Sequence, residues 1–316
     1  MMLFPPEEGA LLDKVRPMLE RRIRLGRPID LKLTLGPLVR GRSSPSVRID
    51  DGAVWRAALT PDGAGTQLLS ITGDVLEVRA WGPGAPWLLE TAPAIAGLED
   101  DAERFDPPPG IVRNLARRMP GLRLPATRCV MEVLVPTILE QKVVGVAARR
   151  SYRGLMAALG EPAPGPRPGL FVPPGPARLA ELPYWELHRF DVERRRADAI
   201  RAAAANAARL EDALRTGVPE LRRRLLRLPG IGEWTCAIVA RLAAGDSDAV
   251  EEGDFNLPNT ITWALAGEER GDHGRMLELL EPYRGQRARA VRLIEASGVR
   301  APRRRPRLPI EAFAAR

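Results

Sequence analysis

Two groups of residues in the last third of the sequence could do chemistry together. The first is the stretch from Leu228 to Gly232 (LPGIG), which separates a basic segment at 221–228 from an apolar one at 233–244. Proline ends a helix and glycine permits a tight turn, so this pattern predicts a helix, a hairpin and a second helix. Backbone N–H groups at the start of that second helix would bind an anion such as a phosphate. The second group is Asp254, 22 residues after Gly232, whose carboxylate could stabilise a developing positive charge.

Each group also has a purely structural interpretation. The LPGIG stretch could be an ordinary corner between two helices, and Asp254 could cap a helix that begins near Phe255. The capping and chemical roles of Asp254 are compatible. The other carboxylates that could take the chemical role are Asp246, Asp248, Glu251 and Glu252.

The order and separation of the two groups resemble the helix-hairpin-helix DNA glycosylase superfamily, in which a catalytic Asp follows the hairpin at a similar distance. A second match is the stretch from Thr137 to Val143 (TILEQKV), which resembles the segment that this family uses to probe DNA. With the N-terminal region, the matches are closest to the alkylation-repair branch, the 3-methyladenine DNA glycosylase II enzymes. The resemblance covers about residues 105–300.

The resemblance implies a reaction and a partner. The reaction is hydrolysis of the N-glycosidic bond of an alkylated purine such as 3-methyladenine in double-stranded DNA, as in base excision repair. Asp254 would lie beneath the sugar and stabilise its oxocarbenium-like charge. Two alternatives stay open: excision of an oxidised or deaminated base, and a helix-hairpin-helix protein that binds DNA without catalysis.

The resemblance also assigns residues to the site. Family members that cut the strand carry a lysine two residues after the second glycine; Trp234 stands there instead, which predicts a monofunctional hydrolase. Trp234 could be an aromatic wall for an extruded base or a core residue. The further pocket candidates are Phe255, Tyr283 and Trp185; the phosphate-binding candidates are Leu228, Pro229, Gly230, Ile231, Gly232 and Thr235.

The DNA-probing loop is assigned to Gln141 and Lys142. The alkylation-repair branch often has an apolar residue where this chain has Lys142, so the inserted side chain is left open. Gln141 could reach an orphaned base. The alternative for both residues is the end of a solvated helix.

Composition agrees with a polyanionic partner. The 316 residues include 48 Lys and Arg against 40 Asp and Glu, which gives a net charge of +8. A membrane surface is the competing partner, but the sequence has no apolar run of about 18 residues and no export-signal pattern at its start. We therefore expect a cytoplasmic monomer, nucleoid-associated if bacterial, with no membrane partner.

No cofactor and no metal are expected from the side chains. Cys129 and Cys236 are too few for a disulfide framework or a four-cysteine iron–sulfur cluster. His188 and His273 stand at no metal-ligand spacing with them. The resemblance leaves open one structural ion, held by carbonyl groups of the hairpin.

The sequence predicts an α+β protein: a small antiparallel sheet domain over 1–104, a helical glycosylase domain over 105–300 and a basic tail over 301–316. Residues 11–25 predict a basic helix, and the alternation at 31–35 predicts a strand. Further strands are expected at 46–49, 54–59, 67–72 and 75–80. Helices are expected at 129–159, 179–187, 192–214, 221–228, 233–244, 260–265, 274–280 and 286–297, with a loop at 161–176. The tail is either a phosphate contact or a solubilising end.

Overall fold

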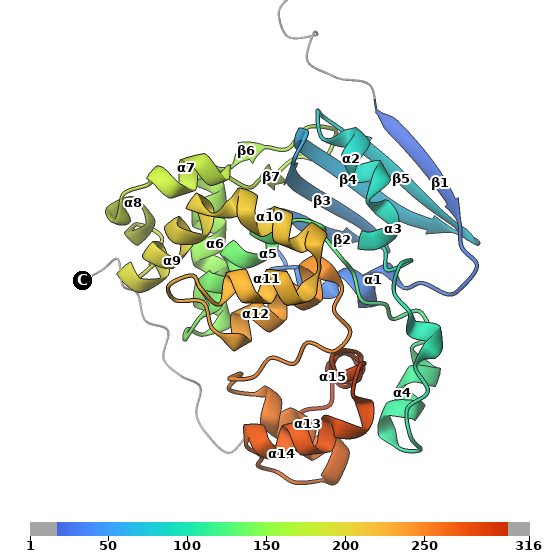
Figure 1. The fold of residues 1–316 in the computed structure, drawn as a ribbon. Helices are drawn as coiled ribbons and strands as arrows, with labels where there is room; N and C mark the ends of the chain where they lie inside the picture. The colour runs from blue at the N-terminus through green and yellow to red at the C-terminus, as the bar shows by residue number, and fades with distance from the viewer. Residues whose placement is uncertain (1–17, 303–316) are drawn as a thin grey trace, which may run out of the picture.

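The computed structural model describes residues 18–302 and has a twisted antiparallel sheet on one side and helices on the other (Figure 1). The sheet has five strands in the order β1-β5-β4-β3-β2. Their bounds are β1 Leu19–Arg24, β2 Val47–Asp50, β3 Ala53–Thr60, β4 Gly63–Thr72 and β5 Val75–Trp81. This confirms the predicted α+β class.

Short hairpins set the register of strands β2 to β5. The β2–β3 turn uses Asp51 and Gly52, both with positive φ, as a tight two-residue hairpin requires. The resulting register aligns Val54, Leu69 and Val78 across three strands, and all three side chains are fully buried. This row forms the base of the core on the helical side of the sheet.

Two predictions for the N-terminal part are wrong. Residues 19–24, which were predicted as part of a helix, form strand β1, which pairs with β5 at the sheet edge. The part of the predicted helix before residue 18 lies outside the described residues. Residues 31–35 form helix α1 (Leu31–Leu35), because Asp30 accepts a hydrogen bond from the Leu33 amide at 2.9 Å and caps it. Leu31 and Leu35 are buried four residues apart. In a segment of only five residues, this spacing fits one face of a helix and also the alternation of a strand.

From residue 82 to 302 the regular structure is helical, apart from a short hairpin of β6 (Glu161–Pro162) and β7 (Phe171–Val172) in the predicted loop. The helices are α2 Ala85–Glu90, α3 Ala92–Ile95, α4 Ile111–Arg118, α5 Val130–Glu140, α6 Gly145–Leu159, α7 Pro176–Glu181, α8 Tyr184–His188, α9 Arg194–Ala205, α10 Ala207–Thr216, α11 Val218–Leu225, α12 Glu233–Val239, α13 Leu257–Ala266, α14 His273–Leu280 and α15 Arg287–Ala296. Short 3₁₀ turns lie at Gly36–Leu38, Ala102–Arg104 and Glu281–Tyr283, and a π-helical turn at Ala240–Ala244 continues α12. None of the helices in residues 18–302 is both long and apolar enough to cross a membrane.

Most of the described helices belong to two large hydrophobic cores, and α2 packs on the sheet in a smaller one. The larger core joins the sheet to α5, α6 and α9 to α12, and it includes Val54 of β3 and Val133 of α5. The second core joins α4 to α13, α14 and α15, which lie together in Figure 1. The larger core contains residues from both sides of the predicted domain boundary at residue 104. The division into two domains therefore stays a prediction. The predicted tail from 303 lies outside the described residues.

A buried ion pair ties the sheet to the helices. Arg56 of β3 is 1% exposed and donates from Nε to Glu132 Oε1 of α5 at 2.8 Å. It also donates to the Thr127 carbonyl at 3.1 Å. Burial alone would lower the pKa of Arg56, but the attraction of Glu132 outweighs it and the pKa is raised. The pair therefore holds α5, and the loop that follows it, in a fixed position on the sheet.

Candidate DNA interface and catalytic carboxylate

The predicted hairpin is present between α11 and α12. Helix α11 ends at Leu225, and the chain turns through Gly230, whose φ is +78°. A side chain at Gly230 would bring its Cβ within 3.0 Å of the Ala199 Cβ on α9. Both the left-handed backbone and the close packing therefore require glycine.

The outer side of the hairpin has backbone donors without protein acceptors. Within the described residues, nothing accepts a hydrogen bond from the amides of Gly230 and Gly232, which precede α12. The amides of Glu233 and Trp234 lie in the first helical turn, where no intrahelical acceptor exists. Pro229 and Gly232 are exposed. The binding of an anion by these amides stays a prediction.

The inner side of the hairpin is held by Gln141. Its side-chain nitrogen donates to the Gly230 carbonyl and to the Thr235 hydroxyl, both at 2.9 Å. Thr235 is 1% exposed and Ile231 is 7% exposed, so these two side chains serve the shape of the hairpin. The amide of Gln141 was predicted to reach DNA; in the structure it binds the hairpin instead. Lys142 is exposed at the tip of the loop, with a φ of +55°.

Hairpin carbonyls were predicted as ligands of a structural ion. The carbonyl oxygens of Leu228, Gly230 and Gly232 each accept one hydrogen bond, from the Ile231 amide, Gln141 and the Cys236 amide. An ion would use their second lone pairs, and it stays a prediction.

Asp254 lies beside the first turn of α12 and is held by three donors. Its Oδ1 accepts from the amides of Asn256 at 2.7 Å and Leu257 at 2.8 Å, at the start of α13. Its Oδ2 accepts from the Trp234 indole nitrogen at 3.2 Å. Asp254 therefore binds the first amides of α13, whose N-cap residue is Asn256, and at the same time its carboxylate is oriented toward α12. The side chain stays partly exposed.

A buried ion pair anchors the loop that carries Asp254. Arg241 and Glu251 are 7% and 6% exposed, and the Arg241 Nε donates to Glu251 Oε1 at 3.0 Å. Burial raises the pKa of Glu251, and the neighbouring Arg241 only partly opposes this. The Asp254 amide donates to the Glu251 carbonyl at 3.2 Å. Glu251 is therefore a support for Asp254 and not a competitor for its role.

Two other carboxylates of this loop accept hydrogen bonds from neighbouring protein groups. Asp248 Oδ1 accepts from the backbone amide and the Nε of Arg287, at 3.1 and 2.8 Å, at the start of α15. Asp246 accepts from the Asp248 amide at 2.9 Å. Glu252 is exposed. Of these alternatives, none has the position of Asp254 beside the hairpin helix.

Comparison with known proteins decides the fold. A 3-methyladenine DNA glycosylase of Archaeoglobus fulgidus superposes with a TM-score of 0.73 at 18% identity, over 87% of this chain and 97% of that one. An 8-oxoguanine glycosylase/lyase of Clostridium acetobutylicum, solved with double-stranded DNA, gives 0.69 at 11% identity, over 90% and 98%. The chain has the helix-hairpin-helix DNA glycosylase fold. This confirms the resemblance that the two motifs predicted.

One curated relative matches about half of the chain. The probable bifunctional transcriptional activator/DNA repair enzyme AlkA of Mycobacterium tuberculosis is 32% identical over 148 residues, which is 46% of this chain. The match spans 29% of that relative, so the chain corresponds to less than a third of its length. No protein-family model matches the chain.

The four predicted pocket aromatics differ in position and burial, and their pocket role stays a prediction. Trp185 lies on α8, far from α13 in Figure 1, and its side chain is 67% exposed. Tyr283 is 8% exposed and lies in the second core, its ring 6.5 Å from that of Phe105. The sequence around Trp185 and Tyr283 does not indicate where in the fold either ring lies. Phe255, next to Asp254, is 74% exposed, and Trp234 is partly buried.

The remaining predicted chemistry groups are accounted for. Cys129 and Cys236 are free and buried. His188 bonds the Tyr184 hydroxyl at 3.1 Å, and His273 accepts from the Gly253 amide at 3.5 Å. Among residues 18–302, no cluster of His, Cys, Asp or Glu could hold a metal.

Three features were not predicted from the sequence: the Arg241–Glu251 pair, the bonds of Gln141 to the hairpin, and the exposed Val146 next to the predicted probing loop. Val146 is 55% exposed in the first turn of α6, beside the probing loop. An apolar residue directly after Gly145, at a helix start, was the available signal for it.

Proposed function

We propose that the protein is a monofunctional DNA glycosylase of base excision repair that hydrolyses the N-glycosidic bond of alkylated purines in double-stranded DNA. The observation that carries the proposal is the position of Asp254: three donors hold its carboxylate beside the first turn of the hairpin helix. A phosphate on the hairpin amides would fix the DNA backbone, and a deoxyribose would then lie near this carboxylate.

The chemistry follows from the charge that develops when the base leaves. The sugar becomes cationic, and a fixed carboxylate stabilises that charge without having to reorganise. An alkylated purine is a good leaving group because it is already positive. Trp234 has no amine, so the covalent route of the strand-cutting glycosylases is not open at this position.

Support for an alkylated substrate comes from the relatives. The curated relative is named as AlkA, and one structural neighbour is named as a 3-methyladenine glycosylase. The neighbour named for 8-oxoguanine keeps the oxidised-base alternative in the test.

The test is to incubate the protein with methylated duplex DNA and identify the free bases by chromatography. Duplexes that contain 8-oxoguanine or uracil serve as the comparison, and strand cutting is followed on the same samples. We expect release of 3-methyladenine without strand cutting. Release of 8-oxoguanine or uracil alone would overturn the substrate class. DNA binding without release of any base would overturn the activity.

A further inference from the structure

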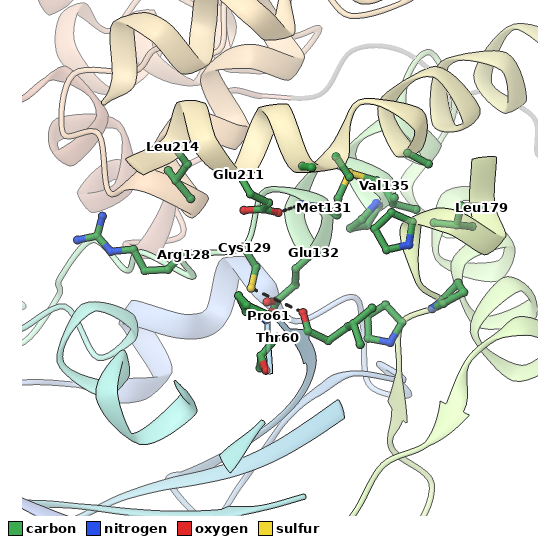
Figure 2. Close-up of a pocket in the computed structure, with 18 of the residues that line it drawn as sticks. Thr60, Pro61, Arg128, Cys129, Met131, Glu132, Val135, Leu179, Glu211 and Leu214 are labelled. Carbon is green, nitrogen blue, oxygen red and sulfur yellow. Dashed lines mark hydrogen bonds between the residues drawn. The ribbon is translucent and has the colours of Figure 1, made fainter. Parts of the chain in front are cut away.

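A cavity of about 750 Å³ lies between the sheet and the helices (Figure 2), and Asp254 does not line it. It is bounded by the β3–β4 turn, α2, α5, α6, the start of α7, and α9 and α10. None of the predicted site residues lines it. Its size falls in the range of small-molecule sites.

The walls of the cavity are apolar and well ordered by the larger core. Val135, Leu155, Met156 and Leu179 contribute side chains that are at most 7% exposed. Alanines of α9 and α10 leave the space open on the helical side, and Ala208 at its edge is exposed. The cavity opens to solvent at this edge, which gives a ligand a way in.

One charged group in the lining has no ionic partner. Among the described residues, the lining cations Arg128 and Arg215 pair with Glu99 and Asp212, and Glu132 pairs with Arg56. Glu211 forms no ion pair within residues 18–302; its carboxylate accepts only backbone amides, from Val130 at 2.9 Å and Met131 at 3.3 Å. Glu211 is therefore the lining carboxylate without a salt bridge among the described residues; Arg215, which pairs with Asp212, attracts it from beyond ion-pair distance.

Burial works against that charge. Desolvation raises the pKa of Glu211, and the two amides at the start of α5 oppose the shift only in part. A cation brought next to the carboxylate would offset the desolvation that the fold imposes. The apolar walls would accept the rest of such a molecule.

We propose that this cavity binds an apolar small molecule that carries one cationic group. The hydrocarbon part lies against Met156 and Leu179, and the cation lies at the Glu211 carboxylate. The site is separate from the proposed catalytic one, and the proposal does not depend on glycosylase activity.

The test uses three compounds of one shape: adamantan-1-amine, adamantan-1-ol and adamantane-1-carboxylate. Their affinities for the full chain are measured by titration calorimetry at neutral pH. We expect the amine to bind one to one, the alcohol more weakly and the carboxylate not at all. Glu211→Gln should weaken the amine about tenfold, toward the alcohol, because one charge-assisted contact is lost.

Glu90→Gln is the matched control, because it makes the same change at an exposed residue of α2 that does not line the cavity. It should leave amine binding unchanged. Ala208→Trp, a change at an exposed residue of the cavity edge, should block all binding without unfolding the protein. Equal affinity for amine and carboxylate, equal amine affinity of Glu211→Gln and wild type, or no binding of any compound would each overturn the proposal. Base release from methylated DNA by Glu211→Gln should equal that of wild type.

Discussion

Replacing Trp234 separates two roles that the indole could have at the site. Trp234→Phe keeps an aromatic ring but removes the N–H that donates to Asp254 Oδ2 at 3.2 Å. A hydrogen bond to a charged group contributes about 1.5–3 kcal/mol, and this long, partly exposed one belongs at the lower end. We therefore expect about a tenfold slower base release from Trp234→Phe, since about 1.4 kcal/mol corresponds to a factor of ten.

Trp234→Leu removes the ring as well. If the ring also stacks on the extruded base, the loss should grow by a further 1–3 kcal/mol, roughly 5- to 150-fold. The assay is single-turnover release of 3-methyladenine, with DNA affinity measured separately. Trp185→Phe, at an exposed position on α8, is the control and should change neither quantity. Wild-type release by Trp234→Phe together with slow release by Trp234→Leu would refute the positioning role.

Three further predictions concern the hairpin, the loop before Asp254 and the overall charge. Gln141→Ala removes both bonds to the hairpin, so it should lower the free energy of unfolding by about 1–2 kcal/mol and weaken DNA binding. Lys142→Ala, the control, should weaken DNA binding alone. Equal stability of Gln141→Ala and wild type in urea titrations would contradict this. Partial burial alone would raise the pKa of Asp248, but hydrogen bonds from Arg287 lower it below its ordinary 3.8. Its stabilisation is therefore present above pH 3.8 and lost as pH falls through the folded value, so the cost of Asp248→Asn in unfolding titrations should be constant near neutrality and vanish in acid. DNA affinity should fall steeply with salt, with a logarithmic slope of about 0.9 per phosphate contacted, and a flat salt titration would contradict a phosphate-binding role for the hairpin.

The hairpin and the position of Asp254 in the chain could be predicted from the sequence because their signals are local. Gly230 is fixed by a backbone angle and a close contact, and a helix start marks Asp254. Strands β2 to β5 were predictable for the same reason, since turn residues separate them.

The features that sequence could not give depend on distant partners. The bond of Gln141 to Gly230 joins residues 89 apart, and the Arg56–Glu132 pair joins residues 76 apart. No periodicity encodes such a pairing. Residues 19–24 form an exposed edge strand, where pairing with β5 and not side-chain burial decides the structure. The residues 31–35 were too few for their spacing to distinguish helix from strand.

The central claim is that the Asp254 carboxylate stabilises the sugar cation, and one measurement tests it directly. Single-turnover base release from methylated DNA is compared for wild type, Asp254→Asn and Glu252→Gln, an exposed carboxylate of the same loop. We predict a loss of about 100-fold or more for Asp254→Asn, with DNA affinity retained, and wild-type release for Glu252→Gln. Unchanged base release by Asp254→Asn would contradict the account.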